Sequence, residues 1–181
     1  AFTAFSSTFT ASVRSVALLP DGRILVGGLN TASQPVLIRL QSNGSLDTSF
    51  NPGLVASTGA VNKLLLLPDG RVVAAGFFTP SATGQEVELA AFQSAGSLAT
   101  TFLANLGSGS NGPVLDLVFQ PDGTLLASGV FNLWNGQPRA SLARLSLAGE
   151  LLADPAPPPY TDNRDNPNVT PFYLTHFYSL A

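Results

Sequence analysis

Three stretches of sixteen residues decide the fold of this chain. They read VRSVALLPDGRILVGG at residues 13–28, VNKLLLLPDGRVVAAG at residues 61–76 and VLDLVFQPDGTLLASG at residues 114–129. In each stretch a Val stands seven residues before a Pro-Asp-Gly turn, and a Gly stands eight residues after its Pro. Because three copies share these fixed positions, the chain contains an internal repeat, with spacings of 48 and 53 residues between its turns.

Each stretch predicts a β-hairpin. The apolar runs before the turn are residues 13–19, 61–67 and 114–120, and those after it are residues 23–27, 71–75 and 124–128. Short runs rich in Val, Ile and Leu between turn residues are typical of strands. In the turn, Pro presets the first corner, Asp tolerates the second, and Gly takes the left-handed conformation. We therefore interpret Asp21, Asp69 and Asp122 as turn residues rather than catalytic or metal-binding ones.

The repeat extends beyond the hairpin. A third strand is expected at residues 36–40, 87–92 and 140–145, and a fourth, after a Gly, at residues 45–50, 97–102 and 150–154. Several short strands in a repeated unit of this length are typical of a propeller blade. The predicted fold is therefore all-β, built from tandem four-stranded blade repeats in a β-propeller-like arrangement. The predicted units are an N-terminal strand completing a preceding or neighbouring blade (1–12), three repeats (13–53, 54–106 and 107–154), and a Pro-rich linker with an aromatic C-terminal segment (155–181).

Composition narrows the class of protein. With 45% hydrophobic and 10% charged residues, the chain is too apolar to be disordered throughout. Its net charge is -3 and it has no basic stripe, which argues against a nucleic-acid partner. It has no apolar run long enough for a membrane-spanning helix. The scarcity of Lys and the abundance of Ser, Thr, Gly and Ala fit a secreted bacterial surface protein, so we expect an extracellular or cell-surface location, with a signal peptide that is absent or removed.

The sequence offers little for catalysis. It has one His, His176, and no Cys, so it cannot form a zinc site of the usual ligands. No Ser lies in a nucleophile-elbow pattern, and the glycine-rich residues 107–110 lack the strand-to-helix context of a phosphate loop. Asp162 and Asp165 lack the spacing of a calcium loop, and a solvated turn is favoured for them. We expect no enzyme activity, no cofactor and no bound metal.

Trp134 is the candidate ligand contact. It lies with Asn135 and Gly136 in the longest loop of the repeats, where an indole ring can stack on a sugar. The alternative is that Trp134 anchors its loop by packing. Carbohydrate is therefore a possible partner of this chain, and both interpretations stay open at this point.

Closure of the fold is the main problem that the sequence raises. Closed propellers typically have about four to eight blades, so three repeats form either an incomplete ring or an open stack. Open blade faces and strand edges need a cover. The chain is therefore a fragment of a longer array or is completed by partners, and two copies forming a six-bladed ring is one option.

The two terminal segments are the candidate assembly contacts. Residues 5–9 align with residues 46–50 of the first repeat, whereas the aromatic residues 169–180 match no strand of the repeat. Exposed aromatic side chains gain much from burial, so the C-terminal segment is expected to dock on its own blades or on another subunit. The predicted contacts of a homo-oligomer or polymer are Phe5, Phe9, Phe172, Tyr173, Leu174, Phe177 and Tyr178.

The first repeat resembles the delta-60 repeat family of bacterial proteins. The resemblance rests on Pro-Asp-Gly-Arg at residues 20–23, Arg39-Leu40, and NGSLDTSFNPG at residues 43–53, and it extends over about residues 3 to 154. The later copies depart from it, since the second repeat has Ala91-Phe92 in place of Arg39-Leu40 and Ala99 in place of Asp47. The resemblance implies a β-propeller-like fold in large extracellular or cell-surface proteins, without an assigned activity.

These observations favour a non-catalytic extracellular structural or self-assembly protein. It would be a surface or filament subunit built from blade repeats, with terminal segments that mediate subunit contacts. The alternative is a ligand- or glycan-binding propeller module.

Overall fold

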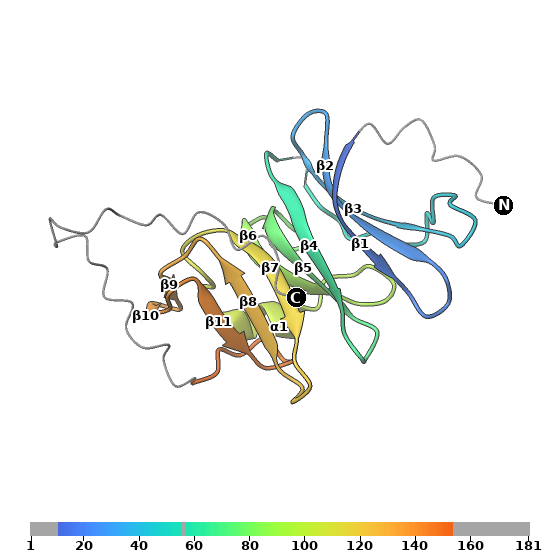
Figure 1. Cartoon of the computed structure of the whole chain (residues 1–181). Coiled ribbons are helices and arrows are strands. Elements are labelled where there is room, and N and C mark those ends of the chain that lie inside the picture. The colour runs from blue at the N-terminus through green and yellow to red at the C-terminus, as the bar shows by residue number, and fades with distance from the viewer. Residues whose placement is uncertain (1–10, 56, 154–181) are drawn as a thin grey trace, which may run out of the picture.

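The computed structural model describes residues 11–55 and 57–153. They form three antiparallel sheets of three strands each, one sheet per repeat, which lie one beside the next (Figure 1). The all-β blade-repeat prediction is thereby confirmed. The strands are β1 (Ala11–Leu18), β2 (Ile24–Asn30) and β3 (Pro35–Leu40); β4 (Ala60–Leu66), β5 (Val72–Phe78) and β6 (Val87–Phe92); and β7 (Val114–Phe119), β8 (Leu125–Gly129) and β11 (Leu142–Leu145).

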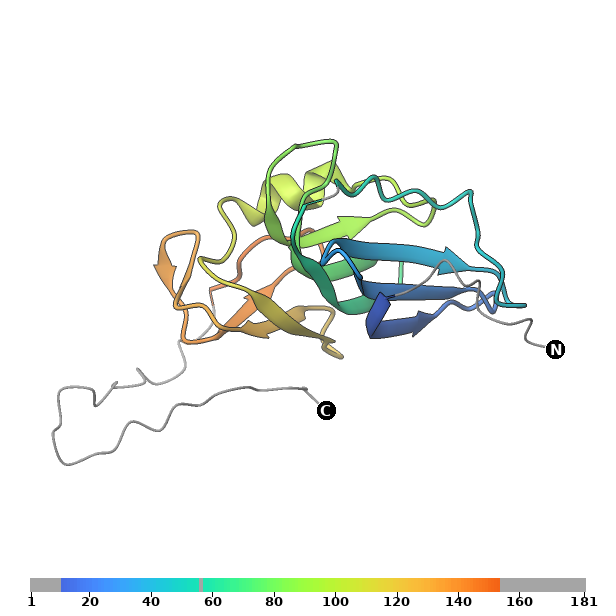
Figure 2. The same ribbon diagram turned by 90° about the horizontal axis from the view of Figure 1, so that it is seen from above.

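We call the three units the first blade (11–55), the second blade (57–106) and the third blade (107–153). Between β8 and β11 the third blade has a small hairpin of β9 (Leu133–Trp134) and β10 (Gln137–Pro138). One helix, α1 (Thr100–Leu106), follows the sheet of the second blade and lies along one side of the molecule (Figure 2). Among the described residues, no helix has the length and apolar character needed to cross a bilayer.

The Pro-Asp-Gly turns have the predicted geometry. In the first blade the Leu19 N–H donates to the Arg23 carbonyl at 2.8 Å, and Gly22 has φ of +83°. Each turn aspartate accepts a bond from the backbone N–H two residues on, at 3.0, 3.0 and 3.1 Å in the three blades. The interpretation of these aspartates as turn residues is confirmed, because their carboxylates satisfy the backbone that closes the hairpin.

A second repeated glycine allows a close backbone approach. We call β1, β4 and β7 the inner strands of their blades. A Cβ on Gly28, Gly76 or Gly129 would lie 2.0–2.1 Å from a backbone carbonyl oxygen at the start of the inner strand or of the residue just before it. In each blade the pairing register shifts at this place, as at Val13/Ser15 in β1. The Gly eight residues after each Pro is therefore required by the β-bulge that bends the first strand.

The predicted fourth strand is wrong. After each third strand the described chain makes one isolated bridge, such as Leu40 with Leu46, and does not continue as a strand. In the first blade the Asp47 carboxylate accepts bonds from the Ser49 N–H and hydroxyl, a local turn that competes with strand pairing. In the second blade Ala99 replaces this Asp, and the chain enters α1 instead, which buries Phe102 and Leu106 one helical turn apart.

The hydrophobic core lies between the blades in two clusters. The first cluster joins the first and second blades and includes Leu25, Leu37, Val61 and Leu64. The second joins the second and third blades and includes Val73, Leu89, Val114 and Leu117. Each blade thus buries its apolar side chains against a neighbour, as expected of a repeat architecture.

Candidate functional site

The surfaces where blades meet are the most elaborate features of the described chain. We call the contact between the first and second blades the first joint, and that between the second and third blades the second joint. At both joints the inner strand of one blade packs on the sheet of the preceding one. In the first joint, for example, a Cβ on Gly27 of β2 would lie 2.7 Å from the Val61 side chain of β4.

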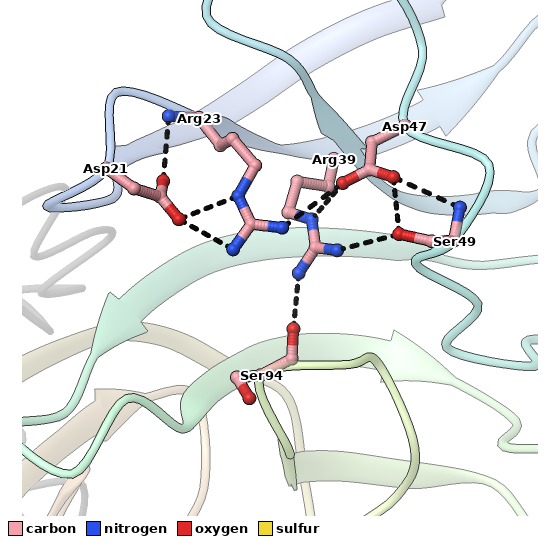
Figure 3. A network of polar contacts seen from close by, with 6 residues as sticks. All are labelled: Asp21, Arg23, Arg39, Asp47, Ser49 and Ser94. Atoms are coloured by element: carbon pink, nitrogen blue, oxygen red, sulfur yellow. Dashed lines mark hydrogen bonds and ion pairs between the residues drawn. The ribbon is translucent and has the colours of Figure 1, made fainter.

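A buried ion pair stands at the first joint. Arg39 of β3 donates from Nε to the Asp47 carboxylate at 2.7 Å, and both side chains are 4% exposed (Figure 3). Arg23 reaches the same carboxylate oxygen at 3.3 Å, while also pairing with Asp21 at 2.6 Å. Two arginines and two aspartates therefore form one network without net charge.

Local hydrogen bonds fix the charge of Asp47. The Ser49 hydroxyl donates to it at 2.6 Å and the Ser49 N–H at 3.1 Å. These bonds, with that from Arg39, hold the pKa of the Asp47 carboxyl well below its usual range, although burial opposes the shift. The guanidinium of Arg39 also lies 4.8 Å from the centroid of the Phe50 ring, in a cation–π contact. Asp47 is therefore a fixed anion that orients two arginines.

Arginines also connect one blade to the next. Arg39 donates to the Ser94 carbonyl of the second blade, and Arg71 donates to the Leu147 carbonyl of the third at 2.9 Å. Ser94 and Leu147 are equivalent, because each lies two residues after the end of its third strand. The donors are not equivalent: Arg39 belongs to a third strand, whereas Arg71 follows a Pro-Asp-Gly turn. At both joints an arginine of the preceding blade thus binds the turn after the third strand, but the two arginines come from different positions in their blades.

The inner strands add a second line of polar contacts. The Leu64 N–H donates to the Ser15 hydroxyl at 3.0 Å, and the Lys63 ammonium lies 2.7 Å from the Asp116 carboxylate. Ser15, Lys63 and Asp116 occupy the same position in β1, β4 and β7. Polar side chains therefore tie each inner strand to the next along the stack.

A cleft of about 470 Å³ opens beside the ion-pair network at the first joint. Its walls are mostly apolar and come from both blades and from Phe119 of β7. Ser94 lines this cleft, whereas the equivalent Leu147 packs against the core of the second joint. The difference between a small and a large side chain at this position helps to keep the first joint open.

Trp134 lies in the core of the second joint. It is 0% exposed, and its ring packs edge-on against Phe131 with centroids 5.5 Å apart. This burial agrees with packing of the loop, the alternative weighed for Trp134, and leaves neither face of the indole open to a sugar. The other seven predicted contacts lie outside the described residues: Phe5, Phe9, Phe172, Tyr173, Leu174, Phe177 and Tyr178.

The Arg39–Asp47 pair is the feature that the sequence analysis missed. The sequence does carry a signal for it, since both residues become Ala in the second repeat, at Ala91 and Ala99. The third repeat keeps the arginine, as Arg144, but has Leu152 at the position of Asp47, so the repeats carry this signal only in part. Within residues 11–55 and 57–153, no cluster of three acidic or histidine side chains is arranged to hold a metal ion.

The fold and these joints define a blade array of the β-propeller class. A family model described as "Domain of unknown function (DUF5122) beta-propeller" matches residues 19–50, 67–102 and 120–151, which is more than half of the chain. The chain belongs to this family, and its β-propeller nature, expected from the resemblance, is confirmed. The assignment to delta-60 repeats stays a prediction.

Other comparisons add little. No curated protein is similar enough to this chain to be matched. One solved structure that it resembles is a protein of unknown function from Bacteroides caccae, with 12% identity and a TM-score of 0.29. The match covers 79% of this chain and 66% of that one, so this chain spans a little under two thirds of its length.

Proposed function

We propose that this chain is a non-catalytic structural protein that assembles through the faces of its blades, as a surface or filament subunit outside the cell. One observation carries the proposal. Val16 of β1 is 59% exposed, whereas the equivalent Leu64 and Leu117 are 4% and 1% exposed. In the second and third blades, the preceding blade covers these side chains. We therefore expect the same face of the first blade to bind another surface.

The exposed face is apolar over more than one residue. Val13 is 45% exposed and Leu18 is 69% exposed on the same strand as Val16. Adjacent exposed apolar side chains on a sheet favour association with another surface. A repeat also buries its apolar face only against its neighbours, and about four to eight blades make up a closed propeller. Assembly with further blades satisfies both requirements.

The electrostatics of the joints support a structural rather than a catalytic role. Hydrogen bonds from Arg23 and Arg71 lower the pKa of Asp21 and of Asp69, and one from Thr124 lowers that of Asp122. With Asp47, these aspartates stay ionised at neutral pH and accept fixed hydrogen bonds. A general acid or base needs a pKa near the working pH, which is the opposite arrangement.

Composition and resemblance support the location. The delta-60 repeat resemblance implies large extracellular or cell-surface proteins, and the Lys-poor composition of this chain fits such a protein. In this proposal the terminal residues 1–9 and 169–180 add contacts between subunits, as predicted from the sequence.

Native mass spectrometry and light scattering over a range of concentrations test the function. We expect particles with the mass of two or more chains. A chain that stays monomeric at every concentration overturns the proposal. Deleting residues 169–181 tests the terminal contacts separately, since an unchanged state of assembly would exclude that segment from the interface.

A further inference from the structure

We infer that the apolar face of the first blade binds the opposite face of the third blade of a second copy of this chain, head to tail. This inference rests on the proposed function and names its partner and its interface. We call the side of a blade that faces the preceding blade its leading face, represented by Val13 and Val16 in the first blade. The trailing face is the opposite side, represented by Leu25 and Leu37 in the first blade.

The leading face repeats in all three blades. Val13, Val61 and Val114 occupy one position, and the last two are 0% exposed because the preceding blade covers them. Val16, Leu64 and Leu117 occupy the next position on this face, with the same contrast in exposure. The first blade therefore exposes Val13 and Val16 of the apolar surface that the two joints bury, whereas Val26, which pairs with Val16, is 1% exposed.

The trailing face repeats as well. Leu25 and Val73 are buried at the two joints, and the equivalent Leu126 of β8 is half-buried. On the neighbouring strand Leu37 and Leu89 are buried, while Leu142 of β11 is half-buried. The apolar pair of the trailing face is thus kept in the third blade, where the described chain has no fourth blade to pack on it.

The two end faces match in size. At the first joint Gly27 stands opposite Val61, within a distance that leaves little room for a side chain. Ala75 holds the position of Gly27 in the second blade, and Ser128 holds it in the third. A small residue on the trailing face meets a Val at the first joint, and the equivalent Ala75 and Val114 lie in one buried cluster at the second. Ser128 with Val13 of a second copy continues this pattern, although Ser128 is 3% exposed, so docking requires the groups that now cover it to move.

The two end faces also match in charge. At the second joint Lys63 of one blade meets Asp116 of the next. Docking of a second copy brings the Ser15 hydroxyl to the inner strand of the third blade, where Asp116 holds the equivalent position. A hydroxyl can donate to a carboxylate, and no like charges meet there.

The inferred contact is heterologous, because the two surfaces that meet are different. Two such contacts between two copies give six blades, within the range of closed propellers. A second copy is therefore a sufficient partner for both end faces.

Engineered disulfides test the register of the joint, which the absence of native Cys makes simple. A Val13→Cys chain is mixed with a Ser128→Cys chain under mild oxidation, and we expect a disulfide between the two chains. Ala75→Cys with Val114→Cys is the matched positive control, because this pair is equivalent and should close within one chain. Val130→Cys replaces Ser128→Cys in the negative control: Val130 is 61% exposed and its equivalent Phe77 is also exposed, so this position lies outside the joints.

Val16→Glu tests the energetics of the same face. A charge buried opposite apolar side chains should weaken association by about tenfold or more, measured by dilution in light scattering. Leu133→Glu is the control, because Leu133 is already 37% exposed outside both end faces, and should leave association unchanged. An oligomer that lacks the Val13–Ser128 disulfide and is insensitive to Val16→Glu overturns this interface but not the proposed function. A monomer overturns both.

Discussion

The two joints hold equivalent blades together with different chemistry. The first joint has a buried ion pair, Arg39 with Asp47, and an open cleft beside it. The second joint has Ala91 and Ala99 at these positions, packs helix α1 and the large apolar side chains of the second cluster, and leaves a cavity of about 400 Å³ beside Ala99. The comparison teaches that blade geometry, set by the hairpin turns and bulges, does not depend on one kind of contact across the joint.

The two solutions differ in what they contribute. Burial of apolar area is the main source of stability. In a buried ion pair, the cost of desolvating the two charges offsets most of their attraction. Hydrogen bonds make such a pair tolerable, and each guanidinium nitrogen of Arg39 donates one, to Asp47, to Ser49 or to the Ser94 carbonyl. The Arg39 network therefore orients the first joint, whereas the second combines a larger apolar core with the Lys63–Asp116 ion pair and the Arg71–Leu147 hydrogen bond.

Truncation of Phe102 and of its equivalent Phe50 should give the largest loss of stability and the clearest difference between the two joints. Phe102 is buried in the second joint, and Phe50 lines the cleft of the first. Both side chains border a cavity, but Phe102 is 1% exposed and Phe50 is 7% exposed. We therefore expect Phe102→Ala to lower the free energy of unfolding by about 4 kcal/mol and Phe50→Ala by about 3 kcal/mol. Urea denaturation measures both. A larger loss for Phe50→Ala would contradict the view that packing matters most at the second joint.

Removing one partner of the ion pair should have the next largest effect. Asp47→Ala leaves Arg39 buried without its carboxylate, and we expect the melting temperature to fall by about 5 °C or more. The double variant Arg39→Ala with Asp47→Ala reproduces the Ala91 and Ala99 of the second blade. It should melt above the single variant, since the uncompensated charge is gone. A double variant that melts below Asp47→Ala would show that the pair contributes more than orientation.

The strands were predictable because their signals are local. The Pro-Asp-Gly turn, the Gly after it and the apolar runs each specify a hairpin without reference to the rest of the chain. The structure places β4 and β7 within one residue of the predicted bounds. The fourth strand was not predictable by the same reasoning. Its residues have a strand-like pattern, but in the first blade Asp47 forms a local turn, and in the second blade, where Ala99 replaces Asp47, the chain forms helix α1.

The site was less predictable than the fold. The Arg39–Asp47 pair joins residues of one blade but orients Arg39 toward Ser94 in the next, a contact across 55 residues that no local pattern specifies. Trp134 shows the reverse: a loop Trp suggests an exposed ligand contact, and only the packing of Phe131 and its neighbours makes it part of the core. Both depend on how blades stack, which the repeat alone does not set.

Low pH should lower the melting temperature by protonating Asp47, which belongs to the first joint. The pKa of Asp47 is lower in the folded than in the unfolded chain, so the unfolded chain takes up this proton first as the pH falls. The stability due to Asp47 is present above the unfolded pKa of about 4 and is lost as the pH falls through the folded value. Between about pH 7 and about pH 3 we expect the native chain to lose more melting temperature than the Arg39→Ala, Asp47→Ala double variant. The other aspartates are common to both chains, so equal losses would mean that Asp47 does not set the difference.

Filling the cleft should give the smallest effect and should make the first joint resemble the second. Ser94→Leu places at the first joint the side chain that Leu147 provides at the second, while the backbone carbonyl that binds Arg39 is kept. Partial burial of the new side chain against the apolar walls should raise the free energy of unfolding by about 0.5–1 kcal/mol. Ser42→Leu is the matched control, because Ser42 holds the same position in the first blade and is exposed. If both substitutions changed stability equally, the cleft would not be the cause, and the open first joint would have to follow from the ion pair rather than from the size of residue 94.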